Sequence, residues 1–188
     1  MAITTIYADQ DGVLAAFWES ALRKLNDKFR RENPISRDEY REYGKFDMAS
    51  LFGVTNKEFW SCVEDSNYFW DSLGTFPWSK DLYDFLRKFA PVTICSSPSD
   101  GLNCVYGKTQ WLKKHIDQSI TTGDCVFTKK KYLLANPNVL LIDDLQENCD
   151  KFIAAGGHAV CVPSTWNTKN LQYNDILERI ITHPAFGK

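Results

Sequence analysis

Five short apolar runs alternate along the chain with longer segments of helical periodicity. The runs, rich in β-branched and other apolar residues, are 3–8, 92–95, 125–128, 139–142 and 158–162. Each has the length of a strand, and strands that are apolar nearly throughout are buried on both faces. Because helices are expected between them, this order predicts an α/β fold with a Rossmann-like parallel sheet flanked by helices.

The helical segments are recognised by apolar positions that recur every three or four residues. They are 14–33, 79–88, 105–112, 147–155 and 171–181. Pro34 breaks the first helix, and Ser79 is expected to cap the second. Gly156 and Gly157 are typical of the residues that end a helix in the left-handed conformation, so the fourth helix is expected to stop there.

The stretch from Pro34 to about Phe76 carries no strand signal and is read as a helical insert. Thr55 and Glu58, three residues apart, form a capping box that predicts the start of a helix within it. The predicted organisation is a core of residues 1–17 and 77–188, with a small helical cap of residues 18–76 inserted after the first strand.

Polar side chains follow four of the predicted strands. They are Asp9 and Asp11, then Ser96 and Ser97, then Lys129, Lys130 and Lys131, and finally Asp143 and Asp144. Ligands of open α/β sheets lie beyond the carboxyl ends of the strands, so these groups are expected in one crevice. Each has an ordinary explanation by itself, such as a turn or a helix cap, but their order favours a site. So many acids repel one another without a cation, and oxygen ligands suit Mg²⁺.

In this order the motifs resemble those of the haloacid dehalogenase-like (HAD) phosphatases. The matching residues are Asp9-Gln10-Asp11-Gly12-Val13, Ser96, a lysine, and Ile142-Asp143-Asp144. More narrowly, the chain is similar to the 5′(3′)-deoxyribonucleotidases. That match lies in residues 11–15 with Phe17, 67–69, 94–98, Lys108 three residues before Trp111, 127–128 and 141–144. The resemblance spans most of the chain, although about 30–58 aligns poorly.

The resemblance implies a HAD-like core and a catalytic set of four residues, namely Asp9, Asp11, Ser96 and Lys131. Asp9 would attack phosphorus and form an aspartyl-phosphate, and Asp11 would protonate the departing oxygen and then activate water. Ser96 would bind a phosphoryl oxygen, while a lysine neutralises its charge. The offset of the motif points to Lys131, with Lys129 and Lys130 as neighbours that would replace it in a shifted register.

The resemblance also implies Mg²⁺ as cofactor and a set of substrate contacts. Asp9 and Asp143 would bind the ion through their side chains and Asp11 through its backbone carbonyl, with Asp144 acting through water. The expected substrate-binding residues are Phe17, Ser97, Lys108 and Lys129.

Aromatic residues make up 14% of the chain, and many lie in or next to the predicted cap. A cap that closes over the sheet excludes water and offers rings on which a nucleobase stacks. For most of these rings the core of the cap is the simpler interpretation. Phe17 is the candidate for base stacking because the matched motif places it there, whereas Trp18 is expected to pack.

The hypothesis is a Mg²⁺-dependent phosphomonoesterase for (deoxy)nucleoside monophosphates, a hydrolase of the 5′-nucleotidase type. A HAD phosphatase for another small phosphate ester, or for a 3′-phosphate at a nucleic-acid end, stays open as an alternative, as does an inactive phosphate-binding relative. A receiver-like signalling module is disfavoured, because receivers carry adjacent acids after the first strand and have no helical insert. Base, sugar and 5′ or 3′ preference are not decided by the sequence.

The charge, hydropathy pattern and cysteine spacing of the chain exclude several classes of binding partner and location. Lys and Arg number 22 against 24 Asp and Glu, a formal charge of −2, which argues against a protein that grips duplex nucleic acid. No apolar run approaches the roughly 20 residues of a membrane span, and the first residues lack signal-peptide features. The six cysteines form no C-x-x-C pair and are typical of reduced thiols. We therefore expect a cytoplasmic protein with a small-molecule partner; a homodimer stays open.

Overall fold

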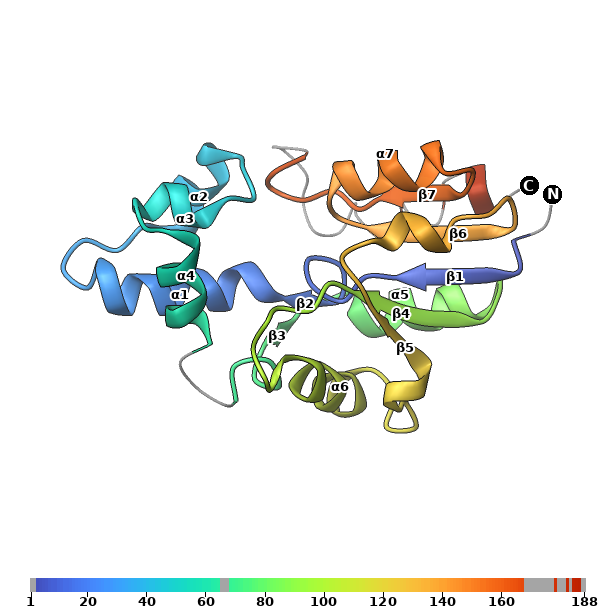
Figure 1. Ribbon diagram of the computed structural model, residues 1–188, viewed down its shortest axis with the longest axis horizontal. Helices are drawn as coiled ribbons and strands as arrows, with labels where there is room; N and C mark the ends of the chain where they lie inside the picture. Colours follow the sequence, from blue (N-terminus) through green and yellow to red (C-terminus); the bar gives the residue numbers. More distant parts are fainter. Residues whose placement is uncertain (1–2, 65–67, 168–177, 179–181, 183, 187–188) are drawn as a thin grey trace.

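A five-stranded parallel sheet organises the molecule (Figure 1). The computed structural model describes residues 3–64, 68–167, 178, 182 and 184–186. The strand order is β5-β4-β1-β6-β7, and neighbouring strands run parallel. The strands are β1 Thr5–Ala8, β4 Val92–Ser96, β5 Cys125–Phe127, β6 Val139–Asp143 and β7 His158–Cys161. All five expected strands are confirmed, and with them the α/β fold class.

The register of β1, the middle strand, brings three strand ends together. Ala8, its last residue, pairs with β4 two residues before Ser96 and with β6 one residue before Asp143. Asp9 therefore emerges between these two side chains. Residues that are far apart in the sequence meet at the carboxyl edge of the sheet, where α/β proteins bind their ligands.

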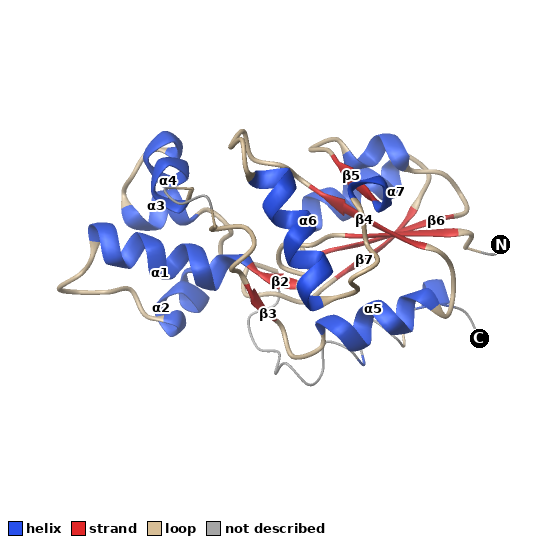
Figure 2. Cartoon of the chain, turned by 90° about the horizontal axis from the view of Figure 1, so that it is seen from below, coloured by secondary structure: helices blue, strands red, loops and turns tan. Residues whose placement is uncertain are grey.

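Helices cover both faces of the sheet. They are α5 Ser79–Arg87, α6 Cys104–His115 and α7 Gln146–Ala154, with short 3₁₀ turns η1 Thr122–Asp124, η2 Lys131–Leu134 and η3 Pro184–Phe186. Ile142 of β6 belongs to the same buried cluster as Leu82 of α5, whereas Leu141 packs against Phe152 of α7. Successive strand residues thus face opposite layers, and α5 and α7 lie on opposite sides of the sheet (Figure 2). None of the described helices is long and apolar enough to cross a membrane.

Two residues were expected to mark helix ends, Gly156 at the end of α7 and Ser79 at the start of α5. Gly156, just beyond α7, has a φ of 92°, so the left-handed end is confirmed. The expectation that Ser79 caps α5 is wrong. Ser79 is the first residue of the helix, and its hydroxyl donates to the carbonyls of Leu14 and Phe76, because burial there offers it acceptors outside the helix. The helix expected over 171–181 lies outside the described residues except for 178.

Four helices lie at one end of the molecule, away from the sheet, and are called the cap helices below (Figure 1). They are α1 Phe17–Phe29, α2 Arg37–Tyr43, α3 Met48–Phe52 and α4 Asn56–Val63. The capping box of Thr55 and Glu58 is confirmed at the start of α4, and Ser36 with Glu39 forms another at α2. The division of the chain at residues 18 and 76 stays a prediction.

A small antiparallel ribbon stands where the chain enters and leaves the cap helices. Its strands are β2 Ala15–Ala16 and β3 Gly74–Thr75. The expectation that 34–76 contains no strand is therefore wrong at its end. Two residues are too few to produce an alternating pattern, so the pairing had no signal in the sequence.

Candidate active site

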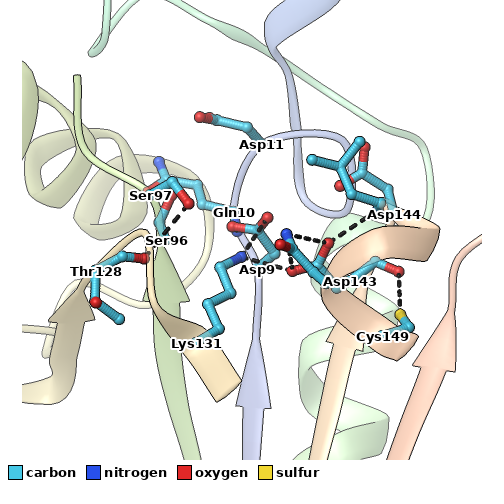
Figure 3. A network of polar contacts seen from close by, with 12 residues as sticks. Asp9, Gln10, Asp11, Ser96, Ser97, Thr128, Lys131, Asp143, Asp144 and Cys149 are labelled. Atoms are coloured by element: carbon cyan, nitrogen blue, oxygen red, sulfur yellow. Dashed lines mark hydrogen bonds and ion pairs between the residues drawn. The ribbon is translucent and has the colours of Figure 1, made fainter. Parts of the chain in front are cut away.

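Lys131 lies between two acids at the carboxyl edge of the sheet (Figure 3). Its Nζ atom is 2.6 Å from Oδ2 of Asp9 and 2.7 Å from Oδ2 of Asp143. The lysine begins η2, and its side chain is almost entirely buried. Burial acts to lower the pKa of Lys131, but the two carboxylates raise it by more, so the net shift is upward and the ammonium form is retained.

Asp9, Asp143 and Asp144 form a buried carboxylate cluster. One oxygen from each lies within 4.8 Å of the others. Burial raises the pKa of Asp143 and of Asp144, and repulsion from the neighbouring carboxylates raises both further. Three carboxylates around the single ammonium of Lys131 leave a formal charge of −2. A close set of oxygen donors with this excess fits a hard divalent cation such as Mg²⁺.

Neighbouring groups orient these acids. The backbone N–H of Gln10 donates to Oδ1 of Asp9 at 2.7 Å. Asn148, on the first turns of α7, donates to both oxygens of Asp143 at 3.1 Å, and the N–H of Leu145 donates to Oδ1 at 2.9 Å. Such bonds hold carboxylates in one orientation, as a ligand set requires.

Asp11 and Ser96 meet at a second buried lysine. Nζ of Lys108 forms an ion pair with Oδ2 of Asp11 and donates to Oγ of Ser96 at 2.9 Å. Burial raises the pKa of Asp11, and Asp9 adds to that, while Lys108 acts in the opposite direction; the net shift is upward. Oδ1 of Asp11 has no hydrogen-bond partner among the described residues. A carboxyl group that has one oxygen without a partner is able to carry a proton there and donate it to a ligand.

A pocket of about 890 Å³ lies between the carboxyl edge and the cap helices. Asp9, Asp11 and Asp144 line it, and so do Ser97 and Lys129, two of the expected substrate contacts. The four other expected polar residues are fully or almost fully buried behind this lining: Ser96, Lys108, Lys131 and Asp143. The structure therefore gathers all the expected polar residues at one place, in two layers.

The three consecutive lysines have different surroundings. Lys131 points into the acid cluster, whereas Lys129 is exposed at the pocket and lies 3.5 Å from Asp100. Lys130 is exposed, and its backbone N–H donates to Thr128. Of the three, only Lys131 reaches Asp9 and Asp143.

Aromatic side chains form one wall of the pocket. Phe17 lines it and stacks on Trp70, with centroids 5.5 Å apart and rings inclined by 15°. Phe17 is only 6% exposed, because Phe69 packs edge-on against it, whereas Trp60 on the same wall is 37% exposed. Trp18 also lines the pocket and stacks on Tyr40, so the expected packing role is accompanied by contact with the cavity.

Several lining residues were not singled out from the sequence. Among them are Lys57 and Glu64 from α4 and its end, Asn148 from α7, and Trp166, which follows β7. Asn148 lies five residues after Asp143. A helix that begins directly after the acid pair would have indicated that Asn148, on its first turns, lies close to Asp143. Glu64 and Lys57 carried no signal, because the path of the insert decides whether they reach the core.

The family of the chain follows from its similarity to known protein families. The sequence model of the family described as 5′ nucleotidase, deoxy (pyrimidine), cytosolic type C protein (NT5C) matches residues 2–176. The chain belongs to this nucleotidase family. The match covers the acid cluster, both buried lysines and the pocket wall, so the nucleotidase is a phosphoric monoester hydrolase with a HAD-type core.

Solved structures that share this nucleotidase's fold include haloacid dehalogenase-like proteins from three organisms. A haloacid dehalogenase-like protein of unknown function from Agrobacterium tumefaciens has a TM-score of 0.63 and 16% identity, over 94% of this chain and 90% of that one. A haloacid dehalogenase-like hydrolase from Streptococcus pneumoniae has a TM-score of 0.60 and 15% identity, with 94% and 90% covered. A HAD hydrolase from Entamoeba histolytica gives 0.57 and 14%, with 94% and 89% covered. These identities establish the shared fold alone. No curated protein matches the chain.

Proposed function

We propose that the protein is a Mg²⁺-dependent phosphomonoesterase that dephosphorylates deoxynucleoside monophosphates through an aspartyl-phosphate. The observation that carries this proposal is the position of the carboxylate cluster and Lys131 at the floor of a pocket with an aromatic wall. The floor has the charges that phosphoryl transfer needs, and the wall has the flat surfaces that a base needs.

Mg²⁺ fits the cluster because its donors are oxygens, because they are close together, and because they carry an uncompensated formal charge of −2. Asp9 and Asp143 would hold the ion with their side chains and Asp11 with its backbone carbonyl, while Asp144 would act through water. When bound, the ion would draw negative charge from the transferring phosphoryl group.

Asp9 is the proposed nucleophile. The N–H of Gln10 fixes one of its oxygens, and Lys131 faces the other. In the first step a carboxylate oxygen of Asp9 forms a bond to phosphorus, and the bond from phosphorus to the sugar oxygen breaks. Lys131 supports this step by holding positive charge beside the oxygens on which negative charge builds up.

Asp11 is the proposed general acid and base. It lines the pocket next to Asp9, and its raised pKa favours the protonated form that gives a proton to the departing sugar oxygen. As a carboxylate it would then take a proton from the water that hydrolyses the aspartyl-phosphate. Ser96 and Lys108 lie behind it and would steady Asp11 and the phosphoryl oxygens.

The pocket wall supports a nucleoside as the rest of the substrate. Trp60 and Phe17 border a cavity of about 890 Å³, which is large enough for a sugar and a base. Ser97 and Lys129 line the same cavity, and we propose that they contact the phosphate or the sugar. The cytosolic type named in the family description supports a cytoplasmic enzyme.

Phosphate release from a panel of ribo- and deoxynucleoside 5′- and 3′-monophosphates tests the proposal, with Mg²⁺ and with a chelator. Release from a few deoxynucleotides that stops with chelator is the expected result. Release from a small aryl phosphate alone would overturn the nucleotide assignment and leave a HAD phosphatase for another ester. Phosphorylated DNA ends and sugar phosphates complete the panel and test those alternatives directly.

A further inference from the structure

Glu64 joins the cap helices to the loop that follows β4. It is the residue directly after the last turn of α4, and one of its oxygens, Oε1, accepts hydrogen bonds from two different parts of the chain. One donor is the indole Nε1 of Trp70, at 2.8 Å, and the other is the hydroxyl of Ser99. Ser99 lies three residues beyond Ser96, on the loop that also carries Ser97.

The position of this acid is unfavourable for the helix that precedes it. The carboxyl end of a helix carries partial negative charge, so an acid there is destabilising. The backbone N–H of Glu64 closes the last turn of α4, but its side chain contributes nothing to the helix that a neutral residue would not. Its tertiary contacts therefore explain the residue better than local structure does.

The loop is shaped to receive the carboxylate. A Cβ atom at Gly101 would lie 2.5 Å from Oε1 of Glu64 and 2.7 Å from Oε2, so only a glycine permits this approach. Ser99 is held in turn, because its hydroxyl accepts from the N–H of Gly101 at 3.3 Å. Gly101 thus leaves space for the carboxylate of Glu64, and Ser99 is held in place to donate to it.

The other donor, Trp70, is part of the pocket wall. Its ring stacks on Phe17 and lies 4.5 Å below the ammonium of Lys108. Glu64 also lines the pocket, beside Ser99 and Gly101. One carboxylate oxygen therefore binds the aromatic wall and the phosphate-side loop at the same time.

We propose that Glu64 is a positioning residue that ties the cap helices and Trp70 to the Ser96–Gly101 loop, and so holds the pocket closed around a nucleotide. The inference rests on the proposed function for its substrate. A ligand that reaches from the acid cluster to the aromatic wall depends on this tie, whereas a small phosphate ester that contacts only the cluster does not. Hydrogen bonds to a charged acceptor are roughly twice as strong as neutral ones, which suits a contact that joins two parts of the chain.

Ser99→Ala is the sharpest test because it removes the tie and keeps the bond from Trp70 to Glu64. We expect KM for the deoxynucleotide to rise about tenfold, the loss of one charge-assisted hydrogen bond, with kcat/KM for a small aryl phosphate unchanged. Gly101→Ala should raise KM for the deoxynucleotide in the same way, because its Cβ atom displaces the carboxylate of Glu64. For Glu64→Gln we expect a KM between those of Gly101→Ala and the wild type. Ser119→Ala is the matched control, since Ser119 also donates to a carboxylate, that of Asp117, away from the pocket.

Amide hydrogen exchange separates this proposal from the proposed function. In Ser99→Ala, α4 and residues 97–101 should lose protection together while α7 keeps it, whether or not nucleotides are the substrate. If the wild-type protein hydrolyses no nucleotide, the proposed function fails and the exchange result still decides the tie. Unchanged exchange and unchanged KM would overturn the proposal. Equal losses on both substrates with a lower melting temperature would also overturn it, because they show a merely structural role.

Discussion

Gly12 gives the space that the carboxylate of Asp144 occupies. A Cβ atom at position 12 would overlap both oxygens of that acid, and Gly12 also has a φ of 77°, a conformation that other residues rarely adopt. The glycine of the first motif is thus coupled to the acid pair of the last one. The turn after β1 and the acid cluster are one structural unit, although about 130 residues separate them in the chain.

Gly12→Ala should therefore lower both stability and metal binding. The left-handed backbone costs roughly 1–2 kcal/mol for a residue with a Cβ, and displacement of Asp144 adds to that. We expect a lower urea midpoint and a weaker rise of the melting temperature with Mg²⁺. Gly53→Ala is the matched control, because Gly53 has a φ of 66° and nothing lies within 4 Å of its Cβ position. It should lose stability but keep the response to Mg²⁺; the same metal response in both variants would contradict the coupling.

Lys131→Met should damage both turnover and stability. It leaves Asp9 and Asp143 buried without their ammonium partner, and breaking such a pair costs about 3–5 kcal/mol. We expect the free energy of unfolding to fall by this order in chelator and to recover in part with Mg²⁺, which balances the same charge. Turnover should fall at least about a hundredfold.

Lys129→Met is the comparison for that variant. Lys129 is largely exposed and lies 3.5 Å from an exposed Asp100, and pairs of this kind contribute about 0–1 kcal/mol. Stability should hardly change, and any effect should be on KM. Urea unfolding and phosphate release of both variants decide which lysine balances the charge of the cluster. A larger loss of stability and turnover in Lys129→Met than in Lys131→Met would show that Lys129 has this role.

Asp9→Asn should abolish turnover without unfolding the protein. The amide keeps the shape of the side chain and an oxygen for the N–H of Gln10, but it is a poor nucleophile toward phosphorus. We expect activity to fall by about 10³ or more, while Mg²⁺ still raises the melting temperature through Asp143 and Asp144. Asp100→Asn, an exposed acid of the same pocket, should stay close to wild type. Undiminished turnover in Asp9→Asn would remove Asp9 as nucleophile.

The carboxyl edge of the sheet was predictable because buried strands are short, apolar and end at a polar residue. Asp9, Ser96 and Asp143 all follow from that rule and from the register that parallel strands impose. The choice among the three lysines depends on η2, a four-residue 3₁₀ turn that begins at Lys131. The motif offset pointed to the same lysine, but periodicity contains no information about such a turn.

The second layer of the site was not predictable from local pattern. Lys108, an expected phosphate contact, is fully buried and pairs with Asp11 and Ser96. That contact depends on how α6 packs beside the sheet. Glu64 depends on the path of the insert between β2 and β3, a two-residue ribbon with no signal of its own. Contacts that depend on tertiary packing need the structure, whereas strand ends do not.

Acid should loosen the first turn of α4. The carboxylate of Glu58 accepts from the N–H and hydroxyl of Thr55, both at 2.8 Å, and these bonds hold the pKa of Glu58 below its ordinary value of 4.5. A lowered pKa in the folded state stabilises it above pH 4.5, and this contribution is lost as the pH falls through the folded value. Exchange protection in the first turn of α4 should therefore decrease below pH 4.5. In Glu58→Gln that decrease should disappear; if it persists, another acid is responsible.

Phe17 has two roles to separate, in packing and in contact with the base. Phe17→Ala removes a ring stacked on Trp70 and should cost about 3–5 kcal/mol, so any loss of activity would be ambiguous. Phe17→Leu keeps most of the volume and should cost less than about 1.5 kcal/mol, while it removes the aromatic face. If the ring stacks on a base, KM for deoxynucleotides should rise about fivefold or more, and hydrolysis of a small aryl phosphate should not change.

Trp60→Ala completes the comparison, because Trp60 borders the same pocket and is 37% exposed. Because its side chain is more exposed than that of Phe17, we expect a rise in KM for deoxynucleotides at a smaller cost in stability. An effect in Trp60→Ala with none in Phe17→Leu would make Trp60 the stacking surface and Phe17 its support. Equal losses on both substrates in Phe17→Leu would mean that Phe17 maintains the aromatic wall and does not contact the base.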